Sequence, residues 1–387
     1  MSKSGFLSFC LISLIVFLSC QGQSKKVLPG AYQINDYLNQ LKDKNVALLV
    51  NQTSVVNGTH LLDTLLSFEI DIKKVFAPEH GFRGNKSNGA LIKDTIDQST
   101  GIPIISLYGN NKKPSTDQLN GIDVIVYDIQ DVGARFYTYI SSMHYMMEAC
   151  AENGIQFVLL DRPNPNGDYV DGPILKNSFS SFVGMHPIPI VYGMTPGEVA
   201  QMIIGEEWLE TTEELDFMVY KTTGWTHSDP YKISIAPSPN LPNDQSIALY
   251  PSLCLFEGTN VSVGRGTEFP FQVIGYPDQK FGSFSFTPIS IPGVSKYPKH
   301  ENKVCYGEDL RSTVPRRALD LSYLIQMYNL SSQKDEFFSS FFDKLAGTDQ
   351  LRIQIEEGMT ESEIKETWKN DLNEFRQIRN KYLLYLD

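Results

Sequence analysis

Short apolar runs alternate with amphipathic segments from residue 46 onward. The runs are rich in Val, Ile and Leu, and they lie at 46–50, 73–77, 102–108, 123–129 and 156–160. Their length and composition predict buried β-strands. Strand–helix–strand order of this kind predicts an α/β fold whose sheet is mostly parallel and doubly wound.

The segment FYTYISSMHYMMEACAENG (136–154), between the last two runs, has apolar residues at helical spacing. It closes at Gly154, a residue type that commonly ends helices. We therefore expect a helix whose apolar face belongs to the core rather than to a cofactor site. The residues on that face are Tyr139, Met143, Met146, Met147 and Cys150.

A Pro- and Asn-rich stretch, APSPNLPNDQSIALYP (236–251), interrupts this pattern. The following SLCLFEGTNVSVGRGTEFPFQVIG predicts strands and loops, and the remainder is mixed α/β. Near the end of the chain one helical face is apolar, with Ile364, Trp368, Leu372, Phe375 and Ile378. We place a domain boundary near residue 250, which gives a larger domain at 31–250 and a smaller mixed α/β domain at 251–387.

The N-terminus predicts an export signal. Lys3 precedes an apolar run that is too short for a good membrane span, and Leu18-Ser19-Cys20 and a polar QGQSKK follow. This pattern is typical of a bacterial lipoprotein, with residues 1–19 removed, Cys20 acylated and 20–30 forming a tether. A plain secretory signal with an incidental Cys20 is the alternative. We expect an exported protein, anchored by lipid in the cell envelope on the periplasmic face of a membrane.

Charge and cysteine content narrow the function classes. The formal net charge is −12 without a basic run, so a nucleic-acid partner would be repelled. The mature chain would keep Cys150, Cys254 and Cys305, whose spacing fits neither a metal knuckle nor a disulfide scaffold. A Cys254–Cys305 disulfide stays open at this point.

Polar residues follow each predicted strand at the point where it ends. Parallel strands place their carboxyl ends on one edge of the sheet, where ligands bind in open α/β folds. We therefore expect these residues to converge on one crevice. They are Asn51, Glu79, His80, Tyr108, Asp128, Asp131, Arg135, Asp161, Arg162 and Asn164.

Five strings together resemble a known family. They are PEHGFRG, YDIQDVGARFYTY, LDRPNP, PSPNLP and YPSLCLFEGTN followed by SVGRGT. In this order the chain is similar to the exo-β-N-acetylmuramidases of the NamZ type from about residue 30 to its end. The resemblance implies a Rossmann-like domain with a smaller C-terminal domain. It also implies release of N-acetylmuramic acid from the non-reducing end of peptidoglycan fragments.

Glycoside hydrolysis usually needs one carboxylic acid for the leaving oxygen and a second group for the nucleophile. Glu79 suits the role of the acid, because it follows a buried strand in a turn flanked by glycines. The alternative is that Glu79 caps a helix or forms an ion pair with Arg83. His80 would polarise Glu79 or bind a sugar hydroxyl, and filling the turn is the alternative. Asp131 is our first candidate for the base or nucleophile. Asp128, Asp161 and Glu257 follow it, and the substrate's own acetamido group is another route.

The lactyl carboxylate of muramic acid calls for a planar cation, which arginine supplies. Tyrosine and asparagine side chains in the same strings could contact the ring and its hydroxyls, although each could equally be structural. The predicted substrate-binding residues are Asn51, Arg83, Asp128, Arg135, Tyr137, Asp161, Arg162, Asn164, Asn240, Glu257, Asn260 and Arg265.

Two other functions stay open. A metal-dependent hydrolase could use His80, Asp128, Asp131 and Asp161, although HExxH and multi-His spacing are absent. A non-catalytic, lipid-anchored glycan-binding protein would need the same crevice but not Glu79. Because NQTSVVNG replaces GxGxxG after the first strand, we predict no nucleotide cofactor, and we expect no metal either.

Overall fold

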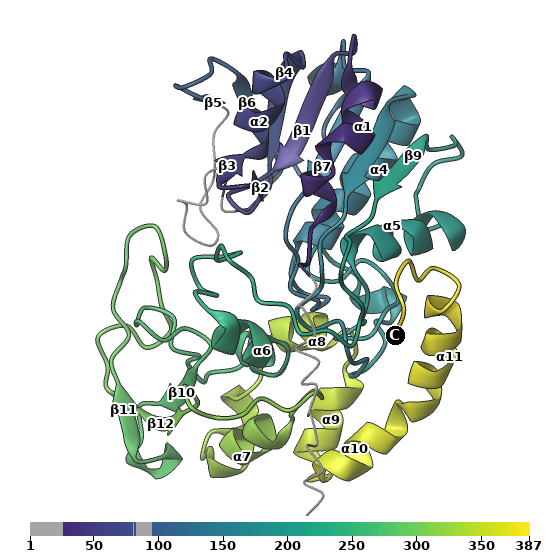
Figure 1. Ribbon diagram of the computed structural model, residues 1–387. Helices are drawn as coiled ribbons and strands as arrows, with labels where there is room; N and C mark the ends of the chain where they lie inside the picture. The colour runs from purple at the N-terminus through teal and green to yellow at the C-terminus, as the bar shows by residue number, and fades with distance from the viewer. Residues whose placement is uncertain (1–25, 80, 83–94) are drawn as a thin grey trace, which may run out of the picture.

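The computed structural model describes residues 26–79, 81–82 and 95–387, which form a sheet domain and a smaller C-terminal domain (Figure 1). The central sheet has 7 strands in the order β5-β6-β4-β1-β7-β8-β9. Neighbouring strands are parallel except β5 and β6. The strands are β1 (Val46–Val50), β4 (Ile72–Ala77), β5 (Thr95–Ile96), β6 (Pro103–Ser106), β7 (Val124–Asp128), β8 (Gln156–Leu160) and β9 (Phe217–Tyr220).

All five strands predicted from apolar runs are present, and the predicted α/β class is confirmed. The edge strands β5 and β9 were not predicted. The residues of β9 are only half-buried, and those of β5 are exposed, so neither strand forms a long apolar run. A short antiparallel hairpin, β2 (Val55–Val56) and β3 (Thr59–His60), follows β1.

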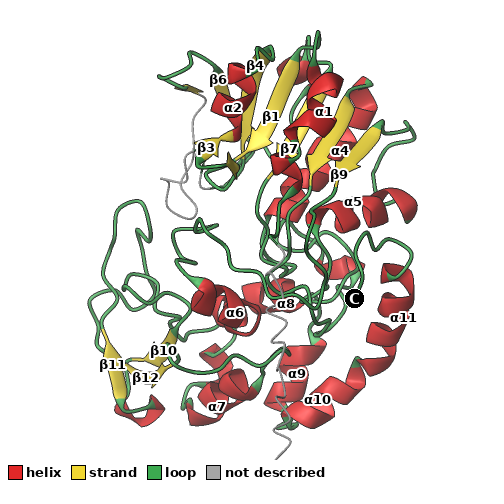
Figure 2. Cartoon of the chain, viewed as in Figure 1, coloured by secondary structure: helices red, strands yellow, loops and turns green. Residues whose placement is uncertain are grey.

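Helices cover both faces of the sheet, as Figure 2 shows. In β1, Val46, Leu48 and Val50 belong to one core, and Ala47 and Leu49 belong to the other. This alternation follows from the two-residue period of a strand, and burial on both faces explains the unbroken apolar runs. The elements of this part are η1 (Gly30–Tyr32), α1 (Ile34–Leu41), α2 (Leu61–Ser67), α3 (Thr116–Leu119), α4 (Tyr139–Asn153), η2 (Asn177–Phe179) and α5 (Pro196–Gly205).

Helix α4 confirms the prediction made from its apolar spacing. Its five predicted core residues are all buried, and Gly154 ends the helix in the left-handed region with φ 63°. Glycine reaches this backbone conformation without the steric cost that a Cβ atom would add. The methionine and aromatic stripe is therefore part of the core.

The C-terminal domain combines helices with a small antiparallel sheet of order β10-β12-β11. Our prediction of strands and loops for SLCLFEG is wrong, because this segment ends α6 and continues as the 3₁₀-helix η3. A capping box of Asn243 and Ser246 begins α6. The elements are α6 (Asp244–Leu253), η3 (Cys254–Gly258), β10 (Val273–Tyr276), η4 (Gln279–Phe281), β11 (Phe284–Phe286), β12 (Cys305–Asp309), α7 (Ser322–Leu330), η5 (Lys334–Glu336), α8 (Ser340–Ala346), α9 (Gln350–Glu356), α10 (Glu361–Thr367) and α11 (Lys369–Arg379).

The apolar face near the chain end is divided between two helices. Trp368 has φ −105° and ψ 4° and separates α10 from α11. Ile364, Trp368, Leu372 and Phe375 are buried as predicted, and Ile378 packs against the same core. In Figure 1 these yellow helices run along the side of the molecule, and the chain end lies against the sheet domain near α5.

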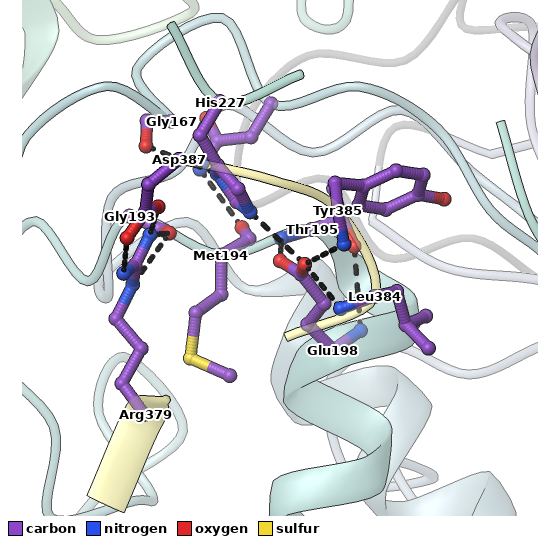
Figure 3. A network of polar contacts seen from close by, with 12 residues as sticks. Gly167, Gly193, Met194, Thr195, Glu198, His227, Arg379, Leu384, Tyr385 and Asp387 are labelled. Atoms are coloured by element: carbon purple, nitrogen blue, oxygen red, sulfur yellow. Dashed lines mark hydrogen bonds and ion pairs between the residues drawn. The ribbon is translucent and has the colours of Figure 1, made fainter. Parts of the chain in front are cut away.

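Polar contacts fix this chain end (Figure 3). Glu198 Oε1 lies 2.9 Å from the Nε2 atom of His227 and accepts the Leu384 backbone N–H at 2.8 Å. Arg379 donates to the Gly193 carbonyl at 2.9 and 2.7 Å and forms an ion pair with Asp387. The last residues of the chain are therefore bound by the sheet domain.

Cys150, Cys254 and Cys305 are buried and free, so the Cys254–Cys305 disulfide left open above is not formed. Cys20 and the predicted signal lie outside the described residues. Among the helices that the structure describes, none combines the length and apolar composition needed to cross a membrane.

Candidate functional site

A cavity of about 350 Å³ lies between the two domains at the carboxyl-end edge of the sheet. One wall comes from the segments after β4, β6, β7 and β8 and from the loop before α6, and the other comes from α6, η3, the segment after η3 and α8. The polar residues of the lining are Glu79, Tyr108, Tyr137, Thr138, Tyr139, Ser238, Asn240, Tyr250, Cys254, Glu257 and Arg265. This position is where ligands bind in open α/β sheets.

Glu79 lies in this cavity, two residues beyond the end of β4. Its side chain is partly exposed, and its Oε2 atom accepts a hydrogen bond from the Thr138 hydroxyl at 3.2 Å. Thr138 is the residue that precedes α4, so the carboxylate sits at the N-terminal end of that helix. His80 and Arg83, predicted to act beside it, lie outside the described residues.

Two tyrosines hold the PSPNLP loop at the cavity. The hydroxyls of Tyr137 and Tyr139 both donate to the Pro237 carbonyl, at 2.8 and 3.1 Å, and Gln52 Nε2 donates to it at 3.0 Å. Burial raises the pKa of both tyrosines above its usual value, so they remain neutral donors. These bonds position Ser238, which lines the cavity from that loop.

Asn240, predicted to bind substrate, also lines the cavity. Its Nδ2 atom donates to the Val294 carbonyl at 3.0 Å, which fixes the orientation of the amide. Within the described chain its buried Oδ1 atom accepts no hydrogen bond. Asn260, by contrast, is held in the C-terminal domain, where its backbone N–H donates to the Phe337 carbonyl at 2.9 Å.

Glu257 and Arg265 form the charged part of the C-terminal wall. Arg265 Nε donates to Oε1 at 2.5 Å and Nη2 donates to Oε2 at 3.0 Å, and the guanidinium lies 5.0 Å from the Phe271 ring centroid. Burial acts to lower the pKa of Arg265, but Glu257 outweighs it and the net shift is upward. The pair therefore presents one fixed carboxylate and one fixed cation to the cavity.

Asp128 and Arg162 form a buried ion pair away from the cavity lining. Arg162 Nε and Nη2 donate to the two carboxylate oxygens at 2.5 and 2.8 Å, and the residues are 0% and 5% exposed. The geometry is bidentate, so each charge is the other's principal partner. Both residues are therefore partners in a structural ion pair, and they do not line the cavity where we predicted them to bind substrate.

Asp131 and Asp161 are also buried and do not line the cavity. Asp131 accepts the Gly133 N–H at 2.7 Å and the Tyr192 hydroxyl, while Asp161 accepts the Tyr385 hydroxyl at 2.6 Å. Burial raises the pKa of each carboxyl to about 6. We expected these carboxylates to lie beside Glu79 in one crevice, but neither of them lines the cavity that contains Glu79.

Arg135 and Asn164 likewise have structural partners. The Arg135 guanidinium donates to four backbone carbonyls, including Ile188 at 2.6 Å and Ala346 at 2.7 Å, and so joins the two domains. Asn164 Nδ2 donates to the Met194 carbonyl at 2.8 Å. Asn51 Oδ1 accepts from Thr53 in the turn after β1. These bonds explain why polar residues at strand ends need not face a ligand.

Several cavity residues were not among our candidates. Thr138, Ser238, Tyr250 and Cys254 lie inside the strings that carry the family resemblance, which was the only signal that could have found them.

Across the described residues, no group of three or more His, Cys, Asp or Glu side chains is arranged to hold a metal ion.

Comparisons with known proteins agree with this architecture. The N-terminal and C-terminal models of the exo-β-N-acetylmuramidase NamZ match residues 46–245 and 248–385. Peptidoglycan β-N-acetylmuramidase NamZ of Bacillus subtilis (strain 168) is 39% identical over 372 residues, covering 90% of this chain and 89% of that protein.

Two crystal structures of DUF1343 family proteins from Bacteroides fragilis NCTC 9343 are also similar. One is 47% identical with a TM-score of 0.87 and covers 94% of this chain and 99% of its own. The other is 28% identical with a TM-score of 0.81 and covers 93% of this chain and 99% of its own.

Proposed function

Because the chain belongs to the exo-β-N-acetylmuramidase NamZ family, we propose that it is a glycoside hydrolase acting on peptidoglycan fragments. It would release N-acetylmuramic acid from the non-reducing end. The observation that carries this proposal is the position of Glu79 in a cavity lined by both domains. A cavity of this kind accepts a chain end more readily than the middle of a chain.

Glu79 acts in this proposal as the acid. The bond between C1 of the terminal sugar and the leaving oxygen breaks, and that oxygen takes the proton of Glu79. Water then supplies the new hydroxyl on C1 and returns a proton to Glu79. The Thr138 hydroxyl holds the carboxyl group in place at 3.2 Å.

Glu257 replaces Asp131 as our candidate for the second carboxylate. Of the acidic residues predicted for that role, only Glu257 lines the same cavity as Glu79. Both of its oxygens are held by Arg265, which suits a carboxylate that orients water or the substrate's acetamido group rather than one that attacks C1. Asn240 Oδ1 would accept the acetamido N–H.

Arg265 is our candidate for the lactyl carboxylate. Its Nε and Nη2 atoms serve Glu257, and in the described part of the chain its Nη1 atom donates no hydrogen bond. A guanidinium held by one carboxylate is preorganised to bind another with little loss of side-chain entropy. The same cation would distinguish muramic acid from a neutral amino sugar.

The test is release of N-acetylmuramic acid from a muramic-acid-terminated disaccharide by the protein beginning at Gln21. Glu79→Gln should lower kcat by about 10²–10⁴-fold, because the amide cannot donate the acidic proton. Glu301→Gln, at an exposed position, is the matched control and should keep full activity. Equal activity of Glu79→Gln and wild type would remove Glu79 from the reaction.

Two outcomes would favour the other functions considered above. Activity lost in EDTA and restored by a divalent ion would point to a metal-dependent hydrolase. Disaccharide binding without turnover by the wild type would point to a glycan-binding protein.

For its location, we propose export and a lipid on Cys20. The support is the apolar run before Leu18-Ser19-Cys20 and the polar residues after it. A lipid anchor would keep the cavity close to the cell wall that supplies the substrate.

A further inference from the structure

A second cavity, of about 370 Å³, adjoins the first. It shares two lining residues with the first cavity, Glu257 and Arg265, so this ion pair is a wall common to both. The remaining polar and aromatic lining comes from the segment after η3 and from the connection between β11 and β12. These residues are Ser262, Ser295, Lys296, Tyr297 and Lys299.

The outer rim of this second cavity is anchored to the wall that carries Glu257. The Lys299 ammonium donates to the carbonyls of Phe256 at 3.0 Å, Glu257 at 3.4 Å and Thr259. These carbonyls lie at the C-terminal end of η3, and the Phe256 carbonyl also accepts the Thr259 backbone N–H at 2.9 Å. At the other side of the rim, the Val294 carbonyl accepts from Asn240 in the first cavity. The rim is therefore coupled to the first cavity at both ends.

Lys296 and Tyr297 project from this anchored rim into solvent. Tyr297 is 79% exposed, and the Lys296 ammonium lies 5.0 Å from the centroid of its ring. A large aromatic side chain left this exposed beside a cavity offers an apolar face to a ligand. The Lys296 ammonium lies over this ring and is exposed, so it adds a cation that can bind a carboxylate.

Resting on the function proposed above, we propose that the second cavity binds the leaving saccharide. Tyr297 packs against the N-acetylglucosamine ring next to the bond that breaks. Lys296 binds the lactyl carboxylate of the muramic acid that follows it. The first cavity holds the terminal sugar, and the rest of the glycan leaves along the wall formed by Glu257 and Arg265. The protein thus prefers glycan chains longer than a disaccharide.

Tyr297 is tested with two substrates that share the same terminal sugar. One is the disaccharide, and the other is N-acetylmuramyl fluoride, whose leaving group is too small to reach the second cavity. Tyr297→Ala should lower kcat/KM about tenfold on the disaccharide and leave the fluoride unchanged. Tyr297→Phe keeps the ring and should stay close to wild type on both.

Lys296 is tested by chain length. Lys296→Ala should lower kcat/KM about threefold on a tetrasaccharide with a second muramic acid, and the loss should fade as salt is added. The disaccharide, which lacks that carboxylate, should be unaffected. Lys303→Ala, an exposed lysine outside the cavity lining, is the matched control and should leave both substrates unchanged.

Each outcome distinguishes this inference from the function on which it rests. A Tyr297→Ala loss that is equal on the disaccharide and the fluoride would overturn the subsite, because the change would then be structural. No loss on either substrate would overturn it as well. A wild type that hydrolyses neither substrate would overturn the proposed activity and the subsite together.

Discussion

Asp131 makes the stability of this protein depend on pH in a direction opposite to that of most carboxylates. Its carboxyl is buried, only Oδ2 is hydrogen-bonded in the described structure, and burial raises the pKa from 3.8 to about 6. That difference corresponds to about 3 kcal/mol between the two protonation states. The folded state binds the Asp131 proton more tightly than the unfolded state does. The protonated carboxyl therefore stabilises the fold by this amount below pH 3.8, and the stabilisation is lost as pH rises through 6.

Asp131→Asn isolates this contribution. The asparagine Oδ1 can accept the same hydrogen bonds from Gly133 and Tyr192, but the side chain does not titrate. The unfolding free energy of the variant relative to wild type should rise by about 2 kcal/mol between about pH 4 and about pH 7, which is most of the total difference of about 3 kcal/mol. Asp161, whose pKa is also raised, is present in both proteins and cancels in the difference.

The measurement is urea unfolding of both proteins across that pH range at constant ionic strength, followed by tryptophan fluorescence. A difference that stays constant with pH, or that changes with the opposite sign, would refute the reasoning. Activity gives a second readout, because Asp131 does not line the cavity and Asp131→Asn should keep turnover near the wild-type rate. A folded variant without activity would return Asp131 to the reaction.

Two further predictions concern an ion pair and the N-terminus. Asp128→Asn leaves the buried Arg162 charge without its partner and should cost about 3–5 kcal/mol of unfolding free energy in chemical denaturation. Asp309→Asn breaks the more exposed pair with Arg311 and should change stability little, so equal losses in the two variants would contradict our account of burial. Cys20→Ala should block palmitate labelling and release the protein from membranes; unchanged labelling would show that Cys20 is not the lipid site.

Much of the sheet could be predicted because its strands are buried on both faces. The run at 46–50 is entirely apolar and became β1, and the runs at 123–129 and 156–160 became β7 and β8. Helix α4 could be predicted for a similar reason, since its apolar spacing and final glycine are local signals. Strand β9 lacks such a signal because it is short and only half-buried.

The candidate site could be predicted only in part, because sequence does not show which way a polar residue at a strand end points. Glu79 lies in the cavity, yet Asp161 and Arg135 do not. Their partners are distant in sequence: Asp161 binds the Tyr385 hydroxyl, and Arg135 binds the Ala346 carbonyl. Nothing in the local pattern distinguishes a carboxylate that awaits a substrate from one already held by such a partner.

The bound chain end has a consequence for how this protein could change by recombination. The boundary near residue 250 suggests two modules, but residues after it satisfy buried carboxylates before it. The Leu384 backbone N–H donates a hydrogen bond to Glu198, and the Tyr385 hydroxyl donates one to Asp161. A first module joined to a foreign second one would carry these acceptors into its interior with donors missing, at a cost of about 1–3 kcal/mol for each. The two parts are therefore expected to be inherited together, as one indivisible unit rather than as exchangeable pieces.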